Sequence, residues 1–165
     1  MPEQETIERA REDEREGKAP STQAGEFVRE EFHHIREGKH GARSTKQAIA
    51  IGLSKARHAG VKLSKPRGQS QKVQRQAERD TQKGQRGQKT ISRRRSRATL
   101  GALKREGRGA ASTREISRQT HRAAQKRSSS SRSNAAHKAV RTKRREGILS
   151  IAGRKAARTR MRFRI

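Results

Sequence analysis

The chain has 165 residues, of which 44 are Lys or Arg and 16 are Asp or Glu, so its formal net charge is +28. Only 27% of the residues are hydrophobic and 2% are aromatic, whereas ordinary globular domains are roughly 45–50% apolar. This composition excludes one large globular core, because too little apolar surface exists to offset the entropy of ordering the whole chain. It indicates one small folded unit joined to long charged segments.

The sequence lacks the features of several other protein classes. It holds no cysteine, which excludes disulfides and thiolate-ligated zinc sites. Its first residues show neither the basic start nor the apolar run of a signal peptide, and no apolar run approaches the ~20 residues that span a bilayer. We therefore expect a protein that stays in the cytoplasm, at the nucleoid if its partner is DNA, and that does not enter a membrane.

The charges are unevenly distributed along the chain. Residues 1–37 hold 11 acids and 6 bases, a net charge of −5, so residues 38–165 carry +33. A cationic block of that size indicates a polyanionic partner. Residues 1–20 are predicted to form a solvated acidic helix with Glu/Arg pairs at i,i+3 and i,i+4. A second interpretation is that this helix mimics DNA and competes with it for the basic segment.

Residues 21–63 contain two amphipathic patterns, which predict a helical hairpin domain. The first helix is expected to begin at Ser21 or Thr22 and to stop at Gly38. A short connection then leads to the second helix. Two amphipathic helices joined in this way are expected to pack antiparallel.

The second helix of the hairpin has clear local signals. Ser44 and Gln47 form a capping box, in which their side chains satisfy helix N–H groups. Gly60 stands where a helix ends in the left-handed conformation. Gly52 lies on the apolar face and would let the first helix come close, although a glycine within a helix costs roughly 1 kcal/mol against alanine.

The core of this hairpin is predicted to be small. Glu31 interrupts the apolar stripe of the first helix and Lys55 that of the second, where a long lysine side chain can extend to solvent. Such a unit barely exceeds the smallest size that folds alone, so we expect marginal stability, or support from a homodimer or a protein partner. The predicted core residues are Phe27, Val28, Phe32, Ile35, Ile49, Ile51 and Leu53.

Residues 64–165 form a basic tail rich in Arg, Lys and Ala. Residues 128–133 are predicted to be a loop, with serines 128–131 as a flexible linker, followed by a helix that Asn134 caps. Like charges at i,i+4 oppose helix formation and short helices are marginal in water, so the free tail is expected to be largely disordered and to gain helix on DNA. Earlier short helices are expected at residues 72–83, 99–106 and 112–127. The fold class predicted for the whole chain is all-α.

Dense cationic runs in the tail are the candidate nucleic-acid-binding residues. Each phosphate neutralised on duplex DNA steepens the salt dependence by about 0.9 in log–log slope. Single-strand and sequence-specific RNA modules stack bases on aromatic side chains, which this chain nearly lacks. Non-specific contact with the duplex backbone is therefore favoured. The candidates are Arg93, Arg94, Arg95, Arg97, Lys104, Arg105, Lys126, Arg127, Arg141, Lys143, Arg144, Arg145, Arg154, Lys155, Arg158, Arg160 and Arg162.

Other site patterns are weak. A helix-turn-helix over residues 22–60 would read bases with only Lys46, Gln47 and Arg57. The six histidines form no H-x-x-x-H pair and have no acids at ligand spacing, so neither a metal nor a cofactor is predicted. The sequence has no Walker loop and no dinucleotide fingerprint, and serines 128–131 lack an accompanying base, so no enzyme is predicted.

Residues 46–57 read K-Q-A-I-A-I-G-L-S-K-A-R. This run resembles a motif, K-Q-A-I-A-I-x-L-S-x-A-R, of small uncharacterised bacterial proteins described as a domain of unknown function and sometimes as DNA-binding. The resemblance covers residues 21–63 and implies a bacterial source, but it supplies no catalytic residues. The tail is similar in composition to the basic arms of histone-like proteins.

Three functions fit these patterns. The first is sequence-nonspecific DNA binding and compaction of the kind seen in histone-like, nucleoid-associated proteins. The second is association with RNA or the ribosome, because basic arms also bind rRNA. The third is an adaptor whose hairpin binds a protein and whose tail only localises it. Charge pattern and the near absence of aromatic residues favour the first.

Overall fold

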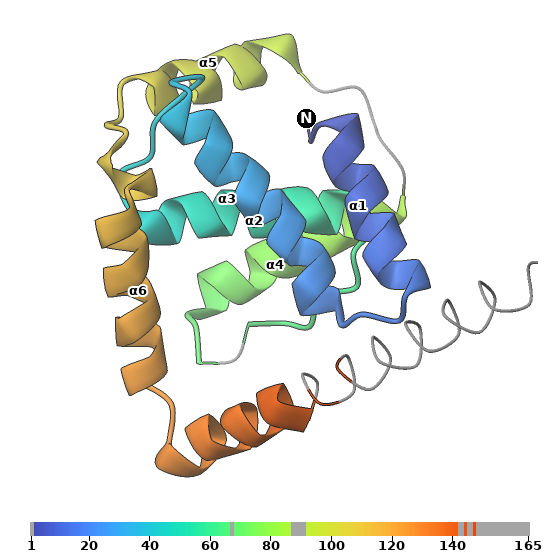
Figure 1. Cartoon of the computed structure of the whole chain (residues 1–165). Coiled ribbons are helices and arrows are strands. Elements are labelled where there is room, and N and C mark those ends of the chain that lie inside the picture. Colours follow the sequence, from blue (N-terminus) through green and yellow to red (C-terminus); the bar gives the residue numbers. More distant parts are fainter. Residues whose placement is uncertain (1, 67, 87–91, 142–143, 145–146, 148–165) are drawn as a thin grey trace, which may run out of the picture. The chain divides into compact units, whose positions relative to one another are not determined.

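The computed structural model describes residues 2–66, 68–86, 92–141, 144 and 147. Within these residues the structure contains helices and connections and no strand, which confirms the all-α prediction (Figure 1). None of the described helices is long and apolar enough to cross a membrane. The elements are α1 (Gln4–Arg15), α2 (Pro20–Arg36), α3 (Thr45–His58), α4 (Gln71–Gln85), α5 (Arg93–Lys104), the 3₁₀-helix η1 (Gly109–Ala111) and α6 (Thr113–Gln125).

The α2–α3 hairpin forms from the predicted local signals. The Gln47 backbone N–H donates to the Ser44 hydroxyl over 3.3 Å, which caps α3. The connection after α2 contains Gly38 (φ +80°), and Gly60 (φ +97°) follows the end of α3. Both glycines adopt the left-handed conformation that side chains disfavour. α3 then runs back across α2 (Figure 1).

Small residues form the line along which α3 meets α2. Ala48, Gly52 and Ala56 are buried at i,i+4 spacing, so the two backbones approach closely. Phe27 and Ile35 of α2 are fully buried. The larger apolar side chains that were predicted to form the core are partly exposed: Val28, Phe32, Ile49, Ile51 and Leu53.

Gly52→Ala is expected to destabilise the protein by about 1–3 kcal/mol, the usual cost of overpacking. A Cβ at this position would lie 2.7 Å from the Cα of Val28. Gly25→Ala in α2 is the matched control, because a Cβ there meets nothing within 4 Å and alanine favours helix by up to about 1 kcal/mol. Urea denaturation of both variants measures the difference, and a stabilising Gly52→Ala would contradict the close approach.

α1 packs on α2 and is part of the folded unit, which corrects the prediction of a solvated helix. Thr6, Ala10 and Asp13 are buried. The physical reason is that Ala10 joins an apolar cluster contributed by several helices, with Ile7 packed against it. The cluster consists of Ala10, Ala24, Phe27, Ala56 and Val61.

A tail segment, residues 103–111, docks on the connection between α2 and α3. The backbone N–H of Gly41 donates to the carbonyl of Leu103 (2.9 Å), and that of Ala42 donates to Gly107 (3.1 Å). The Thr45 hydroxyl donates to the carbonyl of Ala110 over 2.7 Å. Ala110 and Ala111 are buried in a second apolar cluster with Ile35, Ala42 and Ala48.

The predicted boundary after residue 63 lies within the first of two compact units. The chain divides into two compact units, Met1–Gln119 and Thr120–Ile165. The first unit includes α4, α5 and η1 beside the hairpin. Apolar surface for which we expected an external partner is therefore covered in part by segments of the same chain.

The described tail is more helical than predicted. α5 begins at Arg93, so the arginine run lies within a helix and not before one. Residues 129–141 are helical, which shows that the prediction of a flexible serine linker is wrong. The Ser128 hydroxyl accepts from the Ser131 N–H over 3.2 Å, and thus acts as the cap that the sequence assigns to Asn134.

Candidate functional site

The arginine run of the tail is displayed along an exposed helix. α5 buries none of its residues, and Arg93, Arg94, Arg95 and Arg97 are all exposed. Arg93 and Arg97 share a helix face at i,i+4 spacing. Lys104 ends the helix and is exposed, as is Arg105 after it. These exposed bases on and just after α5 are hereafter called the α5 surface.

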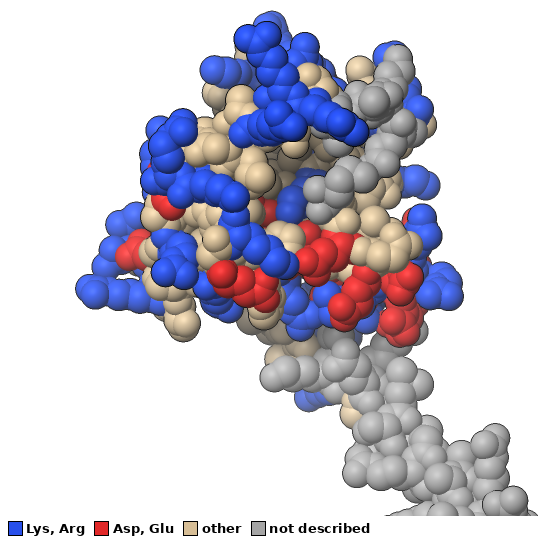
Figure 2. Space-filling model, turned by 90° about the horizontal axis from the view of Figure 1, so that it is seen from above, with Lys and Arg blue, Asp and Glu red and all other residues tan. Residues whose placement is uncertain are grey.

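The α5 surface has no acidic partner among the described residues. The ion pairs of the described chain join acids to other bases, for example Arg9 to Glu5 and Glu26. Lys18 pairs with Asp13 in the same way, and this contact raises the pKa of its ammonium group. In Figure 2 acidic side chains gather in one band among basic ones, while another part of the face carries basic side chains with few acids.

The remaining predicted phosphate donors lie in the second unit or outside the described residues. Four are described there, and all are exposed: Lys126, Arg127, Arg141 and Arg144. The others lie outside the described residues: Lys143, Arg145, Arg154, Lys155, Arg158, Arg160 and Arg162.

α4 packs against the later half of the α3 face that a helix-turn-helix would use to read bases. The Ser54 hydroxyl donates to Asp80 over 2.8 Å, and a ring nitrogen of His58 lies 3.2 Å from the same carboxylate. Arg57, one of three possible base-reading groups, is buried and donates to the carbonyls of Leu53 and Ser64. These contacts do not suit α3 to the major groove.

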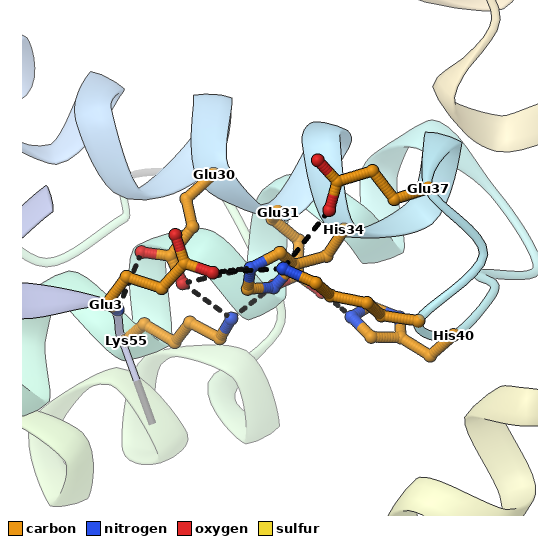
Figure 3. Close-up of polar contacts among 8 residues, drawn as sticks. Glu3, Glu30, Glu31, His34, Glu37, His40 and Lys55 are labelled. Atoms are coloured by element: carbon orange, nitrogen blue, oxygen red, sulfur yellow. Dashed lines mark hydrogen bonds and ion pairs between the residues drawn. The ribbon is translucent and has the colours of Figure 1, made fainter. Parts of the chain in front are cut away.

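The interior of the hairpin holds a cluster of charged groups that the sequence analysis misses. Glu30 and Glu31 of α2 have side chains 2% and 0% exposed. The Lys55 ammonium of α3 lies 2.7 Å from Glu31 Oε2 and 3.4 Å from Glu30 Oε1 (Figure 3). Lys55 therefore does not extend to solvent as predicted, because two buried carboxylates hold its ammonium group inside.

Three further residues, Glu3, His34 and Lys39, connect the start of α1 and the α2–α3 connection to this cluster. His34 Nε2 lies 2.9 Å from Glu3 Oε1, and Lys39 donates to the same oxygen over 3.0 Å. The hydrogen bond with His34, together with Lys39, lowers the pKa of Glu3 to about 2. Glu3 remains charged at any physiological pH, so it ties the start of α1 to the end of α2.

His40 completes the cluster from the α2–α3 connection. Its Nδ1 lies 3.1 Å from the carbonyl oxygen of Gly41, and its Nε2 lies 3.3 Å from Glu31 Oε1. A sequence signal for the group existed: Glu31 and His34 form an E-x-x-H pattern at i,i+3, which places both side chains on one helix face. This pattern contains only one histidine, so it differs from the H-x-x-x-H spacing of paired histidine ligands.

Residues 4–67, the segment that contains α1, α2 and α3, match the model of a family of unknown function (DUF6496). No curated protein and no solved structure shows a significant match to the chain. The family match fits a domain of unknown function, as the resemblance of residues 46–57 implies. It covers the buried cluster of Glu31, His34 and Lys55 and ends before α4.

Proposed function

We propose that the protein binds duplex DNA without sequence specificity and compacts it, as histone-like proteins do. The observation that carries this proposal is the α5 surface, which presents Arg93, Arg94, Arg95 and Arg97 to solvent without an acidic partner among the described residues. A side chain that is already ion-paired must give up its partner to bind phosphate. Unpaired arginines bind phosphate without that cost and release counterions from DNA.

Compaction requires contact with more than one segment of duplex. The first unit carries the α5 surface, and the second carries exposed bases at Lys126, Arg127, Arg141 and Arg144. Each unit thus has its own phosphate-binding groups. A chain with two such groups can bridge two segments of DNA. Once one group is bound, the other is held at a high effective concentration near the DNA.

Binding of the full chain to three labelled ligands at one low salt concentration tests the proposal. The ligands are two duplex DNAs of unrelated sequence and a structured RNA of equal length. We expect equal affinity for the two duplexes and weaker binding to the RNA, because no aromatic platform for unpaired bases is present among the described tail residues. Tighter binding to the RNA would favour an RNA- or ribosome-associated protein instead.

A further inference from the structure

A second site, independent of nucleic-acid binding, lies inside the hairpin. Glu31 and His34 come from α2, and His40 comes from the connection to α3. Each offers one ligand atom, and these atoms all lie within 4.8 Å of one another. We propose that Glu31, His34 and His40 bind a divalent transition-metal ion, with Zn²⁺ as the ion that best fits the ligand set.

The charges of the cluster do not balance without a further cation. Glu30 and Glu31 are both buried carboxylates, and Lys55 is the one permanently charged group among the described residues in ion-pair contact with either. Two buried negative charges therefore face one positive charge. A buried charge without a partner is strongly unfavourable. A second cation beside Glu31 balances the cluster, either a protonated His40, whose Nε2 lies 3.3 Å from Glu31 Oε1, or a bound ion.

The geometry around Glu31 shows where that cation would lie. Neither oxygen of its carboxylate has a hydrogen-bond partner of good geometry among the described residues. When His40 Nδ1–H donates to the Gly41 carbonyl, Nε2 is an unprotonated acceptor that lies 3.3 Å from Glu31 Oε1 without a hydrogen bond between them. His40 Nε2 and Glu31 Oε1 are then two acceptors 3.3 Å apart. Two ligand atoms on one tetrahedral zinc ion, each with a bond of about 2.0–2.1 Å, have about the same separation.

The residues around the three proposed ligands make the hydrogen bonds and ion pairs that commonly orient the ligands of a metal ion. Ligand histidines commonly donate their second ring N–H to a backbone carbonyl, as His40 can donate to Gly41. Glu3 supplies a carboxylate beside His34, and Lys55 neutralises the second oxygen of Glu31. A cleft lined in part by Glu3, Glu30 and His34 reaches one of the three proposed ligands, His34, from the surface.

Two imidazoles and one carboxylate are a ligand set that favours Zn²⁺ over the oxygen-preferring Mg²⁺ and Ca²⁺. The chain itself carries a net charge of +28, which repels cations in general. Saturable binding of Zn²⁺ therefore requires specific ligands. An ion at this position would join α2 to its connection with α3 and add stability to a small core by mass action.

Titration of the chelator-treated and dialysed full chain with Zn²⁺, followed by calorimetry, tests this site. We expect saturation at one ion per chain. Glu31→Gln and His40→Gln are each expected to weaken binding by more than the about 10–100-fold that loss of an outer-shell partner causes. His33→Gln is the matched control, because His33 is exposed on the same helix and lies outside the cluster; its affinity for Zn²⁺ is expected to be unchanged.

X-ray absorption at the zinc edge of the unaltered protein gives a readout that does not depend on whether the variants fold. The expected spectrum contains two imidazole nitrogens and at least one carboxylate oxygen. The absence of one-to-one binding, a spectrum with one imidazole or none, or undiminished binding in correctly folded Glu31→Gln and His40→Gln would each overturn the proposal.

Discussion

Replacing Arg93, Arg94, Arg95 and Arg97 together by glutamine is expected to weaken binding to duplex DNA by orders of magnitude at low salt. Each of the four that contacts a phosphate contributes about 0.9 to the log–log salt slope, so the variant's slope falls by that amount per lost contact. The helix itself should persist, because α5 buries no residue and glutamine is a good helix former. Fluorescence anisotropy across a salt series measures both quantities.

The matched control changes the charge by the same amount elsewhere in the first unit. Arg11, Arg15, Arg29 and Lys62 are exposed bases on α1, α2 and the segment after α3. Their replacement by glutamine removes four positive charges, three of them from the acid-rich residues 1–37, and it is expected to change the salt slope little. An equal loss in both variants would mean that net charge, and not the α5 surface, determines binding.

Lys55→Gln is expected to destabilise the protein by about 3–5 kcal/mol, the usual cost of removing one partner of a buried ion pair. The Lys55 side chain is 19% exposed, and Glu30 and Glu31 on the other side of the pair are 2% and 0% exposed. Without the ammonium group two carboxylates remain close together in the interior. Chemical denaturation with helix content as the signal measures the loss.

Lys46→Gln provides the comparison for this variant. Lys46 lies on the same helix as Lys55 but is exposed, so its replacement is expected to change the free energy of unfolding by less than about 0.5 kcal/mol. If Lys55→Gln were as mild as Lys46→Gln, the ammonium group would not stabilise the buried carboxylates, and the ion-pair cluster would be a wrong description of the interior.

The features predicted correctly from sequence depend on residues close together in the chain. The Ser44 cap joins groups three residues apart, and Gly60 needs only its own backbone conformation. The position of Gly52 on the apolar face follows from helix periodicity alone. Such local signals hold wherever the helix is placed, which explains why α2 and α3 follow the expected pattern.

The features that were missed depend on contacts between distant residues. In the sequence, Glu31 and Lys55 interrupt two apolar stripes. Their burial depends on the ion pair between them, which joins residues of two different helices and therefore cannot be recognised from either stripe alone. The segment that ends in Ala110 and Ala111 has the composition of a tail, yet its backbone carbonyls pair with the connection after α2. No periodicity in the sequence encodes which backbone groups meet.

The central claim is that exposed bases hold polyphosphate by charge and not by base identity. The most direct test is the dependence of the full chain's DNA affinity on salt, measured on two duplexes of unrelated sequence. We predict a linear fall of log affinity with log salt concentration, with a slope of about −0.9 for each phosphate contact and the same slope for both duplexes. Affinity that does not change with salt, or a preference for one duplex that survives high salt, would contradict the account.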